Sequence, residues 1–216
     1  MNLSKRLLSL VKYIEHGDIP ADIGCDHAYL SIYLVLNKIV DKAFISDINE
    51  GALNNGIKNI KKYALEANIK AKLSDGINDI DECVNTLIIS GMGANTIINI
   101  LSNKKISQID KIITQSNNDH DVLRKYLCNN GYYIYDEEVV KDNNKTYINI
   151  VFKRGIKKYR RLELIYGPLL IKYNKDYFND LYLKEKNIYI KIPWKRIILK
   201  LKKIIVLIEI KKIINR

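Results

Sequence analysis

The sequence of 216 residues has only three cysteines, at positions 25, 83 and 128, and no Cys-x-x-Cys pair. An odd, widely spaced set excludes a disulfide framework and offers no zinc-ligand spacing, so we expect a reducing compartment and no metal. The aliphatic run at residues 204–208 is too short to cross a membrane. The first residues alternate apolar and charged positions at helical spacing, unlike a secretory signal peptide. We therefore expect a cytoplasmic protein that does not enter a membrane.

Net positive charge is missing from the first two thirds of the chain. Residues 1–152 carry 17 Lys and Arg against 19 Asp and Glu, whereas residues 153–216 carry 19 against 5. The net charge of +12 therefore lies entirely in the last third, and we expect two domains, residues 1–155 and 156–216. A near-neutral body with a basic appendage favours a polyanionic partner, nucleic acid above all. The alternative is a lysine-rich helical face that is merely solvated.

Short apolar runs alternate with segments of helical periodicity over the first 130 residues. The predicted strands are residues 19–23, 42–47, 69–74, 85–90 and 109–114, and the predicted helices are residues 3–14, 28–36, 50–67, 95–101 and 120–130. Two β-rich runs without a helix between them, residues 132–140 and 147–153, predict a hairpin around a turn at 141–146. Two further helices, residues 162–188 and 194–214, are separated by Pro193.

This order of elements predicts an α/β fold followed by a helical domain. Five βα units closed by a hairpin resemble the Rossmann-like sheet of class I methyltransferases, which is mostly parallel with its last strand antiparallel. The C-terminal segment predicts an α-helical coiled-coil domain. The helix expected at residues 3–14 is interpreted as a lid on the sheet; its Lys5 and Arg6 could touch a phosphate, but a packing role is the simpler interpretation.

The first predicted strand ends in an acid and a glycine, Asp22 and Gly24, directly before a helix. In an open parallel sheet a ligand binds just outside such strand ends, and glycine lets the backbone approach it. Asp47 ends the second strand 23 residues beyond Gly24, close to the spacing at which an acid meets ribose hydroxyls, although a surface turn acid is the alternative. Asp75 with Gly76 could face an adenine amino group or be only a turn.

The glycine pattern of dinucleotide sites, G-x-G-x-x-G, is absent. Gly24 stands alone, and Asp26 and His27 occupy the rest of the turn. S-adenosylmethionine has no pyrophosphate and does not need the full glycine set, so the turn fits that cofactor better than a nicotinamide dinucleotide.

Four strings in this order, ADIGCDHAYL, SDG, GMGA and Q-x-N, resemble the bacterial tRNA (adenine(22)-N(1))-methyltransferase family, TrmK. The similarity covers most of residues 3–152 and continues more weakly through residues 166–170. It implies S-adenosyl-L-methionine as methyl donor, S-adenosyl-L-homocysteine as product and N1 of adenine 22 in tRNA as acceptor. Three positions differ from the family pattern, because Cys25 replaces a serine, Ala94 a glycine and Ser116 a proline.

By position, the resemblance implies two sets of site residues. The implied cofactor residues are Asp22, Gly24, Cys25, Asp26, His27, Asp47, Ile48, Asp75, Gly76, Ser90 and Gly91. The implied substrate residues are Tyr29, Gly91, Met92, Gly93, Ala94, Gln115, Ser116 and Asn117.

Methylation at N1 needs no strong base, because N1 carries a lone pair at neutral pH; the task is to align N1 with the methyl group and sulfur. The product ring is cationic, and Asp26 is the catalytic candidate that stabilises it or accepts an N6 proton; ordering the loop is its equally weighted alternative. We expect His27 to be a structural hydrogen-bonding residue. Tyr29 could stack on a base that has left its pair, or could pack within its helix.

Two other functions stay open at this point. A methyltransferase acting on a small molecule or a protein would use the basic tail for dimerisation. A non-catalytic RNA-binding protein on a methyltransferase fold would need no cofactor. With tRNA as the partner, we expect the protein to be a monomer.

Overall fold

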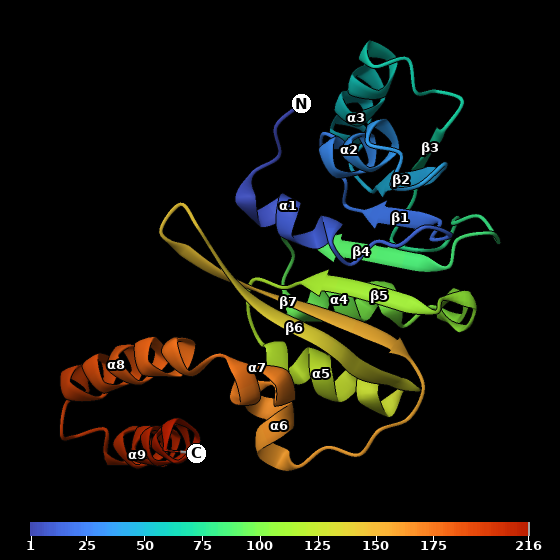
Figure 1. The fold of residues 1–216 in the computed structure, drawn as a ribbon. Helices are drawn as coiled ribbons and strands as arrows, with labels where there is room; N and C mark the ends of the chain where they lie inside the picture. Colours follow the sequence, from blue (N-terminus) through green and yellow to red (C-terminus); the bar gives the residue numbers. More distant parts are fainter. Residues whose placement is uncertain (216) are drawn as a thin grey trace. The chain divides into compact units, whose positions relative to one another are not determined.

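A computed structural model describes residues 1–215, and contacts divide the chain into two compact units, Met1–Lys158 and Tyr159 onward. The first unit contains one sheet with helices on both of its faces (Figure 1). Its strands are β1 (Pro20–Ile23), β2 (Ala43–Asp47), β3 (Ile69–Leu73), β4 (Thr86–Ser90), β5 (Lys111–Gln115), β6 (Tyr132–Asp142) and β7 (Lys145–Arg154). Its helices are α1 (Lys5–Val11), α2 (Tyr29–Leu36), α3 (Glu50–Lys62), α4 (Ala94–Leu101), α5 (His120–Asn129) and the short 3₁₀ helix η1 (Lys104–Gln108).

The sheet has the order β3-β2-β1-β4-β5-β7-β6. The five strands β1 to β5 pair in parallel, and β7 enters antiparallel between β5 and β6. This is the class I methyltransferase sheet that the sequence predicts. The strand order reverses between β1 and β4, so a crevice is expected outside the carboxyl ends of these two strands.

Apolar runs fill the centre of the sheet. β1 is buried at all four residues, and β5 at all five. Strands covered on both faces carry continuous hydrophobic runs, which explains why these segments lack alternation. The amphipathic helix α3 ends at Lys62, five residues before the predicted end at 67, because Ala64 adopts a left-handed conformation with φ of 53°.

The hairpin is tighter than the sequence predicts. β6 and β7 are joined by Asn143 and Asn144 alone, with φ angles of 47° and 59°. Asparagine tolerates positive φ, and two such residues in succession form the turn that matches the twist of paired strands. The strands therefore extend into the segment 141–146, for which the sequence predicts a loop.

The C-terminal unit differs from the two long helices predicted. The helix expected over residues 162–188 is three helices, and they are followed by a fourth: α6 (Arg161–Tyr166), α7 (Pro168–Tyr173), α8 (Lys175–Lys191) and α9 (Ile197–Ile214). Gly167, with φ of 91°, ends α6, and Pro168 takes the first position of α7. The predicted break near Pro193 is present between α8 and α9. α8 packs on α9, and Leu170, Phe178 and Ile210 are fully buried in this unit.

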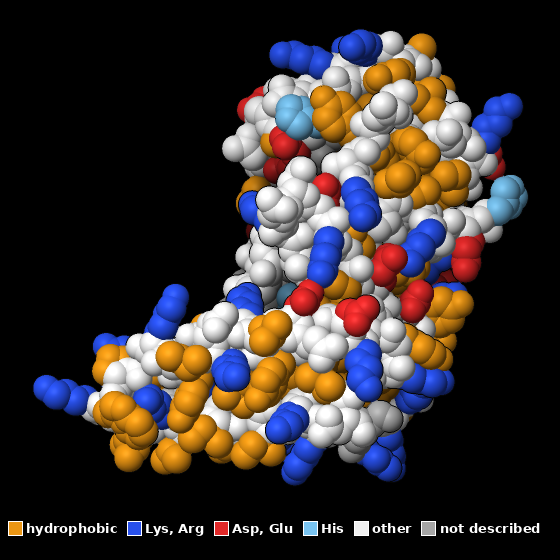
Figure 2. Space-filling view, turned by 60° about the vertical axis from the view of Figure 1, so that its left-hand side comes forward, with side chains coloured by type: hydrophobic (Ala, Val, Ile, Leu, Met, Phe, Trp, Pro, Cys, Tyr) orange, Lys and Arg blue, Asp and Glu red, His pale blue; other side chains and the backbone are white. Residues whose placement is uncertain are grey.

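Large apolar side chains are also exposed on the C-terminal unit. Trp194 is 79% exposed and Ile198 70% exposed, and Figure 2 shows hydrophobic side chains interspersed with Lys and Arg there. Among residues 1–215, no helix combines the length and the apolar character needed to span a bilayer.

Candidate functional site

The turn after β1 is fastened to β2 by its backbone. The N–H groups of Gly24 and Cys25 both donate to the Ser46 carbonyl, at 2.8 and 3.3 Å. Gly24 has φ of 74°, and a Cβ added there would overlap Cε of Met92. Only glycine fits both the backbone conformation and the close approach of this methionine.

Two pockets meet at Gly24, which lines both of them. The larger, which we call the Asp47 pocket, has a volume of about 550 Å³. It is lined by Ile23, Gly24, Asp47, Ile48, Ser74, Asp75, Gly76, Asn78, Met92, Thr96, Asn99, Ile100, Ser102 and Asn103. The smaller, the Asp22 pocket, has a volume of about 380 Å³. It is lined by Arg6, Leu7, Asp22, Gly24, Cys25, Asp26, His27, Tyr29, Leu30, Ser90 and Gly91.

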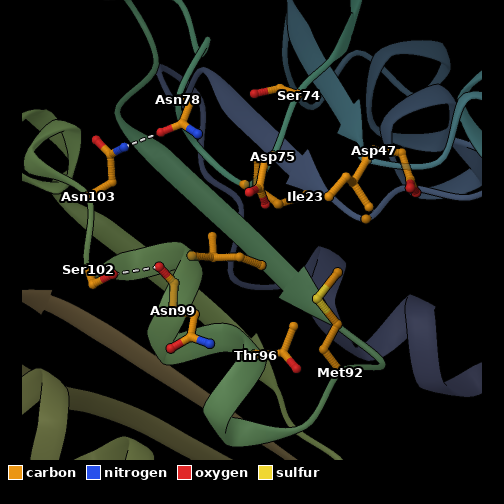
Figure 3. Close-up of a pocket in the computed structure, with 14 residues that line it drawn as sticks. Ile23, Asp47, Ser74, Asp75, Asn78, Met92, Thr96, Asn99, Ser102 and Asn103 are labelled. Carbon is orange, nitrogen blue, oxygen red and sulfur yellow. Dashed lines mark hydrogen bonds between the residues drawn. The ribbon is translucent and has the colours of Figure 1, made fainter.

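The Asp47 pocket places two carboxylates at neighbouring strand ends (Figure 3). Asp47 Oδ1 accepts from the Asn49 N–H at 2.9 Å, and Oδ2 from the Asp26 N–H at 3.4 Å. These bonds fix the carboxylate and leave acceptor capacity on both oxygens. Asp75 is exposed, and Ile48 is an apolar side chain 69% exposed at the pocket edge. Two of the acids predicted from sequence, Asp47 and Asp75, therefore share one pocket with Gly24.

The opposite wall of the Asp47 pocket is polar and was missed by sequence reasoning. It is formed by Thr96 and Asn99 of α4 and by Ser102 and Asn103 after it (Figure 3). Asn103 donates to the side chain of Asn78, which joins this wall to the loop after β3. Thr96 and Asn99 are three residues apart in α4, which places them on one face of the helix, and Asn103 follows soon after the helix ends. That spacing was the available signal.

The Asp22 pocket contains a buried carboxyl group. Asp22 is 6% exposed, and burial raises its pKa to about 7 against the opposing effect of Arg6, while the nearby Asp47 adds to the rise. Burial also raises the pKa of the Cys25 thiol, with Asp22 and Asp47 contributing. Cys25 is therefore a buried neutral thiol and not a nucleophile.

Two aromatic rings stand at the same pocket. The rings of His27 and Tyr29 are stacked, with centroids 5.3 Å apart and planes 19° apart. Asp26 and Ala28, on either side of His27, have φ angles of 46° and 57°. Residues in left-handed or strained conformations persist only where the surrounding structure holds them. His27 Nε2 lies 3.5 Å from Asp26 Oδ2, and the two side chains are 46% and 67% exposed.

The loop that follows β5 is hydrogen-bonded to the loop that follows β4. Asn117 donates from its backbone to the Met92 carbonyl at 2.8 Å and from its side chain to the Gly91 carbonyl at 2.7 Å. Gly93 and Ala94 begin α4, and Ala94 N–H donates to the side chain of Asn118 at 3.1 Å. Gln115 and Ser116 are buried. The residues of the implied substrate set that line neither pocket are Gly93, Ala94, Gln115, Ser116 and Asn117.

His120, next to this loop, contacts it at the start of α5: its Nε2 lies 3.1 Å from the Ser116 carbonyl. Burial and the neighbouring Arg124 lower its pKa to about 4, so the ring is neutral at physiological pH. Within residues 1–215, no three His, Cys, Asp or Glu side chains are grouped closely enough to hold a metal ion.

Comparison with known proteins gives the family. The sequence profile of a family described as "Methyltransferase domain" matches residues 3–150. The tRNA (adenine(22)-N(1))-methyltransferase of Bacillus subtilis (strain 168) is 32% identical to this chain over 72% of its length. The chain spans 66% of that relative's length, slightly under two thirds.

Two solved structures resemble the whole chain. A putative tRNA (m1A22) methyltransferase from Streptococcus pneumoniae is 28% identical, with a TM-score of 0.93 over 99% of this chain and 100% of that one. TrmK from M. capricolum, solved with S-adenosyl-homocysteine, is 29% identical, with a TM-score of 0.86 over 99% of this chain and 98% of that one.

The strand order, the antiparallel β7 and the pockets at the carboxyl ends of β1 and β2 define a class I methyltransferase fold. Because the domain profile covers more than half of the chain, the chain belongs to the methyltransferase-domain family, and the Bacillus subtilis protein that it resembles is a tRNA (adenine(22)-N(1))-methyltransferase. The resemblance inferred from the sequence strings is confirmed.

Proposed function

We propose that this protein transfers a methyl group from S-adenosyl-L-methionine to N1 of adenine 22 in tRNA. The observation that carries the proposal is the convergence of Gly24, Asp47 and Asp75 on one pocket in a chain of this family. The names of the relatives supply the acceptor nucleotide. The lining fits the methyl donor, because Gly24 leaves the junction of the two pockets without a side chain, and a Cβ there would overlap Cε of Met92.

The Asp47 pocket takes the adenosine part of the donor in this proposal. Asp47 accepts from the two ribose hydroxyls with the acceptor capacity that its backbone bonds leave free. Asp75 accepts from the adenine amino group, and the backbone at Gly76 leaves room for the ring. Ile48 supplies an apolar face for adenine, which explains why a large aliphatic side chain is exposed there.

The Asp22 pocket takes the amino-acid part of the donor. Asp22, Cys25, Asp26, Ser90 and Gly91 line it together with His27. The donor supplies an electrophilic methyl group on a sulfonium. The protein aligns the acceptor with that group and excludes water, which is most of what a reaction with a ready lone pair requires.

The target base enters beside the turn that joins the pockets. N1 lies on the pairing edge of adenine, so the base must leave its pair before it can be methylated. The stacked rings of His27 and Tyr29 offer an aromatic face for it, with Gly91 in the same pocket and Met92 in the adjoining Asp47 pocket. Asp26, which lines the same pocket, stabilises the cationic product or accepts an N6 proton in this proposal. Gln115 and Asn117 hold Gly91 and Met92 by hydrogen bonds, and Gly93, Ala94 and Ser116 complete the substrate side.

The C-terminal domain, residues 156–216, binds the tRNA body through its lysine-rich helices, and the methyltransferase domain is residues 1–155. The concentration of positive charge after residue 152 supports this division. We propose that the protein acts in the cytoplasm as a monomer.

The test is incubation with unmodified tRNA and methyl donor, followed by mass spectrometry of nucleosides and mapping of the modified position. We expect 1-methyladenosine at position 22 and none in a matched tRNA with guanine at that position. Methylation of a protein or small molecule in cell extract, with tRNA untouched, would instead support a methyltransferase of the same fold with another acceptor.

A further inference from the structure

We infer that Arg6 binds the carboxylate of the donor's amino-acid end, and that Gln115 and Asn149 hold the Arg6 guanidinium in the position that this requires. The inference rests on the proposed function, because it takes the ligand of the Asp22 pocket to be the methyl donor. It gives α1, expected from sequence to be a lid, a direct part in cofactor binding.

Arg6 reaches the pocket from the first turn of α1. Its backbone N–H donates to Asp142 Oδ2 at 3.0 Å, which ties the start of the helix to the β6–β7 hairpin. The side chain lines the Asp22 pocket together with Asp22 itself. Nη1 lies 3.8 Å from the point that a Cβ on Gly91 would occupy, so the guanidinium is close to the backbone that ends β4.

A closed ring of hydrogen bonds holds this arginine. Nη1 of Arg6 donates to Gln115 Oε1 at 2.9 Å, and Gln115 Nε2 donates to Asn149 Oδ1 at 2.6 Å. Asn149 Nδ2 donates to Ser9 Oγ at 2.8 Å, and that hydroxyl donates to the Arg6 carbonyl at 2.7 Å. Gln115 and Asn149 are both 0% exposed. A satisfied buried network of this kind is rigid, and it presents Arg6 as its one charged member that faces the pocket.

The guanidinium keeps most of its donors unused. Among residues 1–215, the bond to Gln115 is the only hydrogen bond it donates, and no carboxylate lies within 4.0 Å of it. A guanidinium has five N–H donors in a planar fork that matches a carboxylate. The Tyr147 ring lies against the face of the guanidinium, with its centroid 5.6 Å from Cζ. The remaining donors are available to a ligand in the pocket.

The charges of the pocket match the ligand at both ends. The amino-acid end of the donor carries one carboxylate and one ammonium group. Arg6 is the cation of the Asp22 pocket, and Asp22 is its buried carboxyl group, whose charged form Arg6 favours by opposing the rise of its pKa to about 7. A zwitterion placed between them satisfies both charges, with the carboxylate toward Arg6.

The test compares three ligands that differ only at this end, titrated by calorimetry into wild type and R6A. S-adenosylhomocysteine has the carboxylate, its decarboxylated analogue retains only the amine, and 5′-methylthioadenosine has neither. We expect R6A to weaken binding of S-adenosylhomocysteine by about 10- to 100-fold, as for loss of a charge-assisted pair, and to leave the other two ligands within about twofold. Lys5→Ala removes the same charge from the neighbouring, exposed position and should change none of the three.

Gln115→Glu tests the positioning role. A carboxylate at this position would pair with Arg6 and occupy it, so we expect the same selective loss for S-adenosylhomocysteine with binding of methylthioadenosine intact. If R6A does not fold, R6K, which retains the charge without the fork, replaces it and should lose affinity for the same ligand alone.

An equal loss of affinity for all three ligands would show that Arg6 has a structural role. Unchanged affinity for S-adenosylhomocysteine would show that Arg6 does not bind the ligand. Either result overturns the inference. Wild-type protein that binds none of the three ligands would instead overturn the proposed function itself.

Discussion

Met92 covers Gly24. The methyl end of the methionine occupies the space that a side chain at position 24 would need, and Gly24 also holds a φ of 74°. The pair closes one side of the junction of the two pockets, so the donor's sulfur would lie against a wall that has no room for a Cβ.

Substitution of Gly24 by alanine should therefore abolish donor binding. The strain of a positive φ costs about 1–2 kcal/mol, and the overlap with Met92 must be relieved in addition. We expect a lower melting temperature and no detectable heat on titration with S-adenosylhomocysteine. Gly17→Ala is the matched control, since Gly17 has φ of 97° with nothing within 4 Å of the added Cβ. It should lower stability to a similar degree and leave binding intact; equal binding in the two variants would contradict the role given to Gly24.

Asp47→Asn should weaken binding of every adenosine-containing ligand alike. The amide cannot accept from both ribose hydroxyls while it also accepts from the backbone of Asn49 and Asp26. We expect about 10- to 100-fold weaker binding of both S-adenosylhomocysteine and methylthioadenosine by calorimetry. Glu66→Gln, an exposed neutralisation beyond the end of α3, is the control and should have no effect. Unchanged binding in the Asp47 variant would show that this carboxylate does not bind the ribose.

The buried carboxyl of Asp22 should make stability depend on pH. Its folded pKa of about 7 exceeds its ordinary value of 3.8, so between these limits the folded protein holds a proton that the unfolded chain has lost. Stability therefore falls as pH rises through this window, by at most about 1.4 kcal/mol per pH unit, and the penalty is complete above it. Asp22→Asn removes the titration. Melting temperatures of the ligand-free proteins from pH 5 to 8 should show wild type losing stability relative to the variant, and a constant difference would contradict the raised pKa.

Lysines of α9 should contribute to tRNA affinity and to its salt dependence. We expect the triple substitution of Lys202, Lys211 and Lys212 by alanine to weaken tRNA binding. The slope of log affinity against log salt should become shallower by about one for each phosphate that the helix no longer neutralises. The control removes three lysines from α3, namely Lys58, Lys61 and Lys62, and changes the total charge equally. A slope equal in both triple variants would show that net charge alone, and not the C-terminal helices, determines binding.

Much of the first unit follows from local sequence pattern. Buried parallel strands are continuous apolar runs, and polar residues directly after them must gather at one edge of the sheet, so the sequence alone assigns Asp22, Asp47 and Asp75 to one region. The division of the C-terminal segment was also encoded locally. Gly167 and Pro168 end one helix and begin the next, a signal that helical periodicity across them obscured.

Arg6 shows what local pattern cannot supply. It is 109 residues from Gln115 in sequence, and its place depends on α1 lying beside Gln115 of β5 and Asn149 of β7. Nothing in the first helix distinguishes Arg6 from Lys5. The polar wall at Thr96 and Asn99 is intermediate, because its helical spacing was visible but the pocket that it faces was not.

We expect the methyl donor to bind in one continuous site, formed by the Asp47 and Asp22 pockets on either side of Gly24. A crystal structure of the protein with S-adenosylhomocysteine tests this expectation. We expect the ribose hydroxyls on Asp47, the adenine beside Asp75 and Ile48, and the carboxylate on Arg6. A ligand bound anywhere else, or with its amino-acid end turned away from Asp22 and Arg6, would contradict this account.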